Sequence, residues 1–275
     1  MPKGSNKKLQ QCRADLESWQ EANNSLKNKL VAMFLVMLFI STGLILYVVA
    51  ISTSPPVEER PYSNWDGSFY TMLTYAPEHG SVVKYMNVTV SYEDYFNYKF
   101  EANHTSHSYP DAMDVLNALS TYIVTDPITT MIASYVKANC TVPSNGEEVA
   151  NAVLSICQDW GSNHPSIRYL REGVDAAKYP VETVVETTGD CEDQAILFIA
   201  LMKSLGYDMA LLITTEHAFA GVSLAVAPTH HIQPTPTSAL INGTSYWVAE
   251  TTAYGWKVGD LPLELEGETI YGKEI

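Results

Sequence analysis

The sequence predicts an α+β protein in which a central helix packs on an antiparallel sheet, preceded by a single transmembrane helix. Three observations support this fold class. The segment after Cys191, AILFIALMKSLG, is apolar on every side, which is typical of a helix buried all round. Three short β-type runs follow at 208–214, 217–226 and 245–252, and they predict strands joined as hairpins. Residues 30–51 form an uncharged apolar run.

This apolar run is long enough to cross a membrane. Only Ser41, Thr42 and Gly43 interrupt its apolar character. At about 1.5 Å per helical residue, about 20 residues cross a hydrocarbon core of roughly 30 Å. A cleaved signal peptide is the weaker alternative, because the preceding basic region and the apolar run both exceed the usual lengths in signals. We therefore assign residues 30–52 as a membrane anchor, with the lipid bilayer as its partner.

Charge is distributed unevenly along the chain, whose formal net charge is −15. Residues 1–29 carry six basic and three acidic side chains, or +3, whereas the remainder carries 10 basic and 28 acidic groups, or −18. The basic excess ahead of the span predicts a single-pass protein of the cell membrane with a cytoplasmic N-terminus and an extracytoplasmic body. Because so acidic a body repels phosphate backbones, we expect no nucleic-acid partner. Four glycosylation sequons are compatible with the extracytoplasmic side, at Asn87, Asn103, Asn139 and Asn242.

Residues 1–29 are predicted to form a cytoplasmic helix with an a/d heptad pattern. Asn23 falls at an a-like position, where a buried Asn can favour a dimer. Two alternatives are equally supported, a homodimer through these heptads and an amphipathic helix on the membrane surface. The positions that recur at spacings of three and four are Leu9, Cys12, Leu16, Trp19, Asn23, Leu26 and Leu30.

The body begins after a linker at residues 53–66, where three prolines break any regular element. Residues 67–140 form an α/β extension that is either a separate lobe or part of the following domain, at 141–275. Alternating apolar residues predict one or two strands within 68–100.

Helices are expected on both sides of the boundary between the extension and the domain. A helical pattern over 110–138 is broken in two near Asp126-Pro127. Another helix is predicted from about Glu147 to Trp160, with Ser144 as its N-cap.

Three side chains in the C-terminal half have the types that acyl transfer through a thioester requires. Asp190 is a natural N-cap and Gly206 a natural C′ residue, so Cys191 falls in the first turn of the central helix. The free N–H groups and the dipole at a helix N-terminus favour thiolate over thiol. His217 opens one predicted strand and Glu250 lies near the end of another. A nucleophile, a base and a carboxylate that orients the base form a catalytic triad.

Three segments resemble the transglutaminase-like superfamily, and the resemblance covers about residues 145–262. The segments are YPVETVVETTGDCEDQAILFIALMKSLGYDMALLI, EHAFAGVSL and YWVAETTAYGWKVGDLP. They are most similar to its membrane-anchored archaeal branch and also resemble bacterial transglutaminase-like cysteine proteinases. The family motifs fall on Gly189-Asp190-Cys191, His217 and Glu250. The resemblance implies a papain-like core in which Cys191 is the nucleophile, His217 the base and Glu250 the residue that orients His217.

One departure from the family pattern concerns the third member of the triad, which is more often Asp. Glu250 is one methylene longer, so its carboxylate reaches His217 only if its strand sits slightly further away. We expect Asp190 and Asp193 to cap the helix, with tuning of the site as the alternative role. The backbone N–H of Cys191 is the natural oxyanion donor. Gln158 is a candidate for a second donor, with a solvated side chain as the alternative.

A metal site is a rival use for the same residue types, but no HExxH or CxxC spacing is present. No glycine-rich phosphate loop is present either, so we expect neither a metal nor a cofactor. Cys140 and Cys157 either pair outside the membrane or remain two separate buried thiols.

These features predict a membrane-anchored, extracytoplasmic thiol enzyme that acts on a protein or peptide substrate. Water as the second nucleophile would make it a cysteine protease or amidase, and an amine would make it a transglutaminase. The alternative is a catalytically inactive binding or scaffold module that retains the fold.

Overall fold

The computed structural model describes most of the chain beyond residue 61. The described residues are 62–63, 67–77, 82–102, 104, 111–171 and 177–275. Residues 60–275 group into one compact unit. The predicted helix at 1–29, the predicted anchor at 30–52 and most of the predicted linker at 53–66 lie outside the described residues. Within the described part of the chain, no helix has the length and apolar character needed to cross a membrane.

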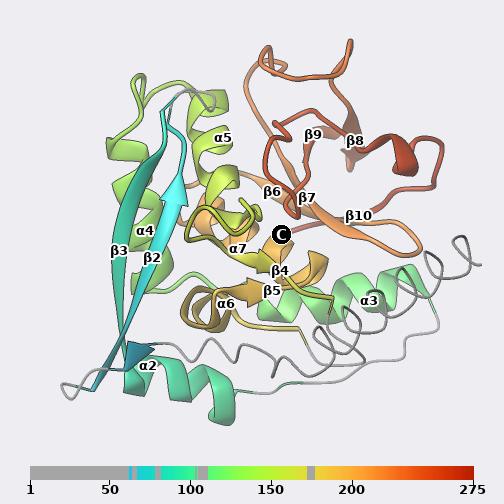
Figure 1. The fold of residues 1–275 in the computed structure, drawn as a ribbon. Coiled ribbons are helices and arrows are strands. Elements are labelled where there is room, and N and C mark those ends of the chain that lie inside the picture. The colour runs from blue at the N-terminus through green and yellow to red at the C-terminus, as the bar shows by residue number, and fades with distance from the viewer. Residues whose placement is uncertain (1–61, 64–66, 78–81, 103, 105–110, 172–176) are drawn as a thin grey trace, which may run out of the picture. The chain divides into compact units, whose positions relative to one another are not determined.

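A five-stranded antiparallel sheet forms one layer of this unit (Figure 1). Alternate side chains of its second strand enter two different cores, so that Leu211 lies in one and Leu212 in the other. Because both faces are covered, the central strands are apolar at every position instead of alternating. In spatial order the strands are β10 (Tyr271–Glu274), β6 (Met209–Ile213), β7 (Ala218–Val222), β9 (Thr244–Ala249) and β8 (Ser238–Ile241).

The predicted antiparallel strands within 208–252 are therefore confirmed as β6, β7 and β9. Two strands of the sheet were not predicted: β8, which lies between the predicted runs at 217–226 and 245–252, and β10 near the C-terminus. Each of these two strands has four residues that are at least partly exposed.

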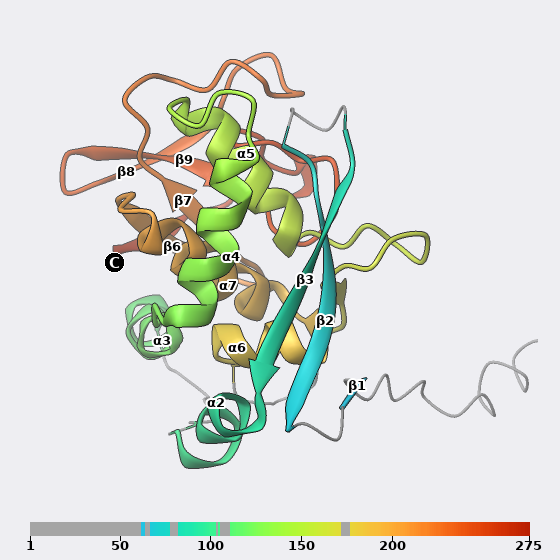
Figure 2. The ribbon, with the colours of Figure 1, turned by 90° about the vertical axis from the view of Figure 1, so that its left-hand side faces the viewer.

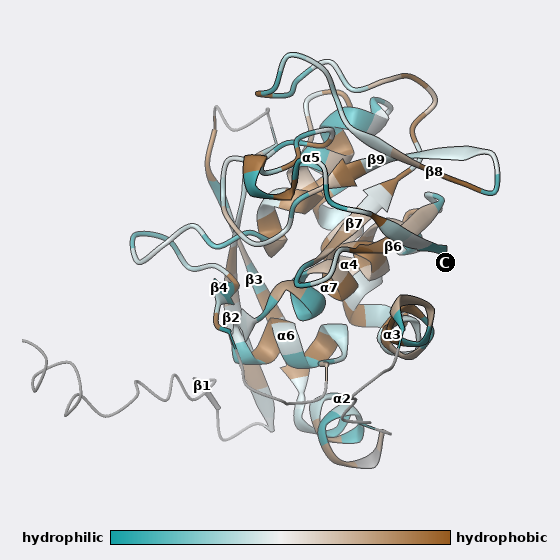
Figure 3. Ribbon diagram, turned by 90° about the vertical axis from the view of Figure 1, so that its right-hand side faces the viewer, coloured by the Kyte–Doolittle hydropathy of each residue, from teal (hydrophilic) through white to brown (hydrophobic). Residues whose placement is uncertain are grey.

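The central helix α7 (Cys191–Ser204) packs against β6 and β7 and against three other helices (Figures 1 and 2). Every residue from Ala195 to Met202 is fully buried. In Figure 3 the apolar colouring of β6 is continuous along the strand, and brown segments also mark the helices around it. The prediction of a helix buried all round is confirmed, and Gly206 follows it with a φ of 83°. The three neighbouring helices are α4 (Pro127–Ala138), α5 (Gly146–Cys157) and α6 (Pro180–Glu186).

The predicted break near Asp126-Pro127 is confirmed. It separates α3 (Ala112–Leu119), extended by the 3₁₀ turn η2 (Ser120–Tyr122), from α4. Asp126 caps α4 by accepting a 2.8 Å hydrogen bond from the Thr129 N–H.

Helix α5 confirms the element predicted from Glu147, but it ends three residues earlier, at Cys157. The predicted N-cap, Ser144, is wrong. Asn145 caps the helix, because its side-chain oxygen accepts hydrogen bonds from the N–H groups of Glu147 and Glu148.

The extension at 67–140 shares a hydrophobic core with the residues that follow it. Leu73, Val88 and Ile132 belong to the same buried cluster as Ile199 of α7. The strands β2 (Ser68–Tyr75) and β3 (Lys84–Ser91) form a long antiparallel pair, and β2 packs against α5 (Figures 1 and 2). The extension also contains α2 (Tyr92–Phe96) and the π-helical turn η1 (Asn97–Glu101).

Three short elements complete the description. Strand β1 (Tyr62–Ser63) pairs with β2, so the end of the predicted linker has regular structure. Strands β4 (Arg168–Tyr169) and β5 (Thr188–Gly189) form a parallel pair just ahead of α7, and η3 (Leu263–Leu265) precedes β10. Cys140 and Cys157 are both free and buried, which decides between the two alternatives in favour of separate thiols.

Candidate active site

Cys191 is the first residue of α7, as its sequence position predicts. Asp190 is the N-cap, and its carboxylate accepts hydrogen bonds from the N–H groups of Glu192 (3.1 Å) and Asp193 (3.2 Å). The N–H of Cys191 has no acceptor within the helix, since it belongs to the first turn. This N–H is therefore available in principle to a negatively charged oxygen beside the thiol.

Asp193 completes the cap from inside the protein. Its carboxylate accepts hydrogen bonds from the backbone N–H groups of Asp190 (3.3 Å) and Lys178 (2.6 Å), and the Lys178 ammonium lies 3.8 Å away. Burial and the Asp190 carboxylate raise the pKa of Asp193 to about 8. The expected capping role of both aspartates is confirmed as a reciprocal capping box.

Gly189 allows this close arrangement. A Cβ atom at position 189 would lie 2.7 Å from the Cβ of Asp193, which is too close for two carbon atoms. In the Gly-Asp-Cys sequence, Gly189 therefore allows the backbone to approach Asp193, Asp190 caps the helix and Cys191 supplies the thiol.

His217 and Glu250 meet where β7 begins and its antiparallel neighbour β9 ends. His217 directly precedes β7, and Glu250 directly follows β9, which is the neighbour of β7 in the sheet. The Nε2 of His217 lies 2.7 Å from Oε2 of Glu250. The other carboxylate oxygen, Oε1, accepts hydrogen bonds from the N–H (2.8 Å) and the hydroxyl (2.6 Å) of Thr252. The longer Glu side chain thus reaches His217 and is held at both oxygens.

Cys191 and His217 line the same cavity, and Cys191 is close enough to raise the pKa of the imidazole. Because Glu250 takes Nε2, the ring nitrogen left for the thiol is Nδ1. Burial lowers the pKa of His217, but hydrogen bonds to Cys191 and Glu250 and their negative charges outweigh burial and raise this pKa to about 10. The imidazole is therefore expected to remain protonated through neutral pH.

Gln158 supports the strand that carries Glu250. It is the C-cap residue of α5 and is only 1% exposed, so the alternative of a solvated side chain is wrong. Its Nε2 group donates hydrogen bonds to the carbonyl oxygens of Glu250 (2.8 Å) and Trp256 (3.0 Å). These two bonds use both amide hydrogens, which leaves none for an oxyanion.

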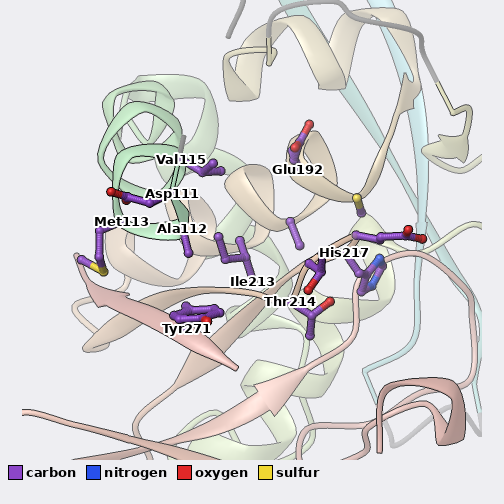
Figure 4. Close-up of a pocket in the computed structure, with 13 residues that line it drawn as sticks. Asp111, Ala112, Met113, Val115, Glu192, Ile213, Thr214, His217 and Tyr271 are labelled. Carbon is purple, nitrogen blue, oxygen red and sulfur yellow. The ribbon is translucent and has the colours of Figure 1, made fainter. Parts of the chain in front are cut away.

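A cavity of about 750 Å³ opens beside the thiol (Figure 4). Cys191 and His217 both line it, and Cys191 is partly exposed, so the candidate nucleophile is accessible. The remaining walls come from the start of α3, from Glu192, from the β6–β7 turn at residues 213–218 and from Tyr271 of β10. Pockets that bind small ligands commonly have volumes in this range.

Sequence reasoning missed three contributors to this site. Thr252 could have been found, because a Thr two residues after a carboxylate is placed to bond it. Glu192 adjoins Cys191 in the sequence. Nothing in the sequence indicates that α3 forms a wall of the cavity, because α3 lies about 80 residues upstream of Cys191.

Among the described residues, no group of three His, Cys, Asp or Glu side chains is arranged to hold a metal ion. Comparison of the chain with protein-family models, with curated proteins and with solved structures found no match.

Proposed function

We propose that the protein is a thiol acyl-transfer enzyme with Cys191 as nucleophile, His217 as acid and base, and Glu250 as the residue that orients His217. One observation carries the proposal: an imidazole held by a carboxylate at 2.7 Å lies within reach of an accessible thiol at a helix N-terminus. Nucleophile, base and orienting group are the three parts that covalent acyl transfer needs.

The proposed reaction has two steps. The Cys191 thiolate attacks an amide carbonyl carbon, and the carbon–sulfur bond forms. The His217 imidazolium gives its proton to the leaving amine as the carbon–nitrogen bond breaks, which leaves a thioester. The neutral His217 then takes a proton from water, whose oxygen attacks the thioester and releases the acid and the Cys191 thiolate.

The backbone N–H of Cys191 is the proposed donor to the oxygen that becomes negative in both steps. We propose hydrolysis of a protein or peptide substrate as the outcome. An amine in place of water would make the same thioester intermediate serve a transglutaminase.

The fold and setting are part of the same proposal. A central helix that begins with the Cys, a strand preceded by the His and a neighbouring strand followed by the acid agree with the papain-like core of the transglutaminase-like superfamily. We propose membership of that superfamily, with residues 30–52 anchoring an extracytoplasmic body to the membrane. The alternative of an inactive binding module was favoured by Glu250 in place of the more usual Asp. The 2.7 Å contact between Glu250 and His217 supports the enzyme over this alternative.

The full-length chain tests the proposal when mixed with 4-nitrophenyl acetate, an activated ester. A burst of nitrophenolate should accompany the addition of one acetyl group to Cys191, located by peptide mass mapping. Cys191→Ala should abolish the burst, and His217→Ala should slow it about a hundredfold. Cys140→Ala, at a buried free thiol outside the site, is the matched control and should retain the burst. Acetylation elsewhere, or a burst that survives Cys191→Ala, would refute the proposal.

A further inference from the structure

The cavity beside Cys191 has an acidic lining. Asp111, Glu192 and Glu216 contribute three carboxylates, and none of the described lining residues is a lysine or an arginine. Lys273 follows Tyr271 by two residues, but its ammonium donates a 2.8 Å hydrogen bond to Ser120 at the other end of α3. Among the described residues of the wall, the only cationic group is thus the His217 imidazolium, which Glu250 already neutralises.

Of the acidic residues that line the cavity, Glu192 is the one next to Cys191 in the chain. No hydrogen bond or ion pair engages its side chain in the part of the structure that is described, although its backbone N–H bonds to Asp190. Burial and the Asp190 carboxylate raise the pKa of Glu192 to about 7, while the charge of His217 lowers it. A partly buried carboxylate that accepts no hydrogen bond gains from a cation that binds beside it.

Thr214 gives an independent indication of a ligand. It lines the same cavity, is 5% exposed, and its hydroxyl has no hydrogen-bond partner among the described residues. Its backbone N–H donates a 2.8 Å hydrogen bond to the His217 carbonyl, so the residue is fixed beside the site. Figure 4 shows it between Ile213 and His217. Native proteins rarely leave a buried hydroxyl unpaired, and a ligand N–H would satisfy it.

The rest of the lining suits an aliphatic chain. Met113 and Val115 of α3 line the cavity together with Ile213 and Tyr271 (Figure 4). A lysine or arginine side chain combines an apolar stem with a terminal cation that donates several hydrogen bonds.

We propose that this cavity binds a basic side chain, lysine or arginine, of a polypeptide substrate, within two residues of the carbonyl group that Cys191 attacks. The inference rests on the proposed function and adds the substrate class to it. The apolar walls hold the stem, Thr214 accepts a hydrogen bond, and Glu192 with Glu216 neutralises the cation.

Three dipeptide vinyl sulfones test this inference with the full-length chain. They carry two lysines, two norleucines or two glutamates ahead of the electrophile, and norleucine is lysine without its ammonium group. The Cys191 thiolate adds to the vinyl carbon, a carbon–sulfur bond forms, and His217 supplies the proton. The rate is followed by mass mapping of Cys191. The lysine probe should react about ten times faster than the norleucine probe, and the glutamate probe should be the slowest.

Two variants assign the preference to the cavity. Glu192→Gln and Thr214→Val should each reduce the lysine-to-norleucine rate ratio several-fold. Glu264→Gln, at an exposed carboxylate outside the cavity, is the matched control and should leave the ratio unchanged. Taking a ratio within each variant removes any change in the intrinsic reactivity of the thiol.

The outcomes separate the two proposals. If Cys191 reacts with all three probes at similar rates, the cavity inference fails and the proposed function stands. Butylamine can also be added to the protein whose Cys191 has been acetylated by 4-nitrophenyl acetate. If butylamine accelerates release of this acetyl group while the lysine probe reacts no faster than the norleucine probe, the cavity serves an amine acceptor and the inference is overturned. If no probe labels Cys191 and 4-nitrophenyl acetate gives no burst, the proposed function itself fails.

Discussion

Glu250 is held at both carboxylate oxygens in the catalytic arrangement that we propose. One carboxylate oxygen holds His217 and the other is held by Thr252, and the side chain is 1% exposed. Such fixed placement reduces the orientational freedom that would weaken an extended Glu–His pair. Gln158, which lies 92 residues earlier in the chain, adds a hydrogen bond from its side-chain amide to the backbone carbonyl of Glu250.

Glu250→Gln should lower the pKa of His217. The wild-type value is raised to about 10 by Cys191 and Glu250 acting against burial, so loss of one negative charge should move it back toward 6.5 by at least about one unit. Proton NMR titration of the His217 ring in the full-length chain measures this directly. Glu264→Gln is the control and should leave the titration midpoint unchanged. A midpoint that is the same in wild type and Glu250→Gln would contradict the assigned role of Glu250.

The same shift links His217 to stability. A folded-state pKa above the unfolded value means that the stabilisation is fully present below about pH 6.5 and is lost as the pH rises through about 10. Glu250→Gln should therefore lose stability mainly at neutral and acidic pH.

At the scale of elements, the start of α7 depends on its cap. Asp190→Ala removes the acceptor for the N–H groups of Glu192 and Asp193 and should destabilise the protein by about 1 kcal/mol. Asp190→Asn keeps a good N-cap without the charge and should cost only a few tenths of a kcal/mol. Denaturant unfolding, together with amide exchange of the first turn of α7, measures both effects.

Asp126→Ala is the matched control for this prediction, because Asp126 caps α4 in the same way outside the site. It should cost a similar free energy of unfolding and leave exchange at the start of α7 unchanged. If Asp190→Asn is as destabilising as Asp190→Ala, the charge of Asp190 matters more than its capping, and the account of this turn is wrong.

The elements that the sequence predicts well are those with local signals. The all-round apolar pattern of α7, its Asp cap and the Gly at its end lie within 17 residues, and all three are confirmed. Strand β10 has no comparable pattern, because it is short and pairs with β6, which lies far from it in the sequence. Strand β8 does have a local signal that was overlooked, since the two-residue turn Asn242-Gly243 joins it to β9. The cap of α5 was misplaced by one residue because Ser144 and Asn145 are both good caps, and neighbouring contacts decide between them.

At the scale of the whole unit, the site combines distant parts of the chain. Helix α3 packs against β6 and β10 and supplies one wall of the cavity. Sequence could propose Cys191, His217 and Glu250 because their types and order match a known chemistry. The sequence could not predict that α3 lies beside these residues, since no residue of α3 has a type or spacing that indicates a site. The shared core explains why the extension at 67–140 belongs with the domain that holds the triad.

Alkylation of Cys191 tests the central claim most directly, because it requires the thiol, the imidazole and the fold that joins them. Full-length protein and His217→Ala are treated with iodoacetamide at pH 6, and mass mapping follows each cysteine separately. We predict that Cys191 reacts at least about ten times faster than glutathione in the wild type and that His217→Ala loses this advantage. Equal, slow labelling in both proteins would contradict the account, since Cys191 would then be a thiol without an imidazolium partner.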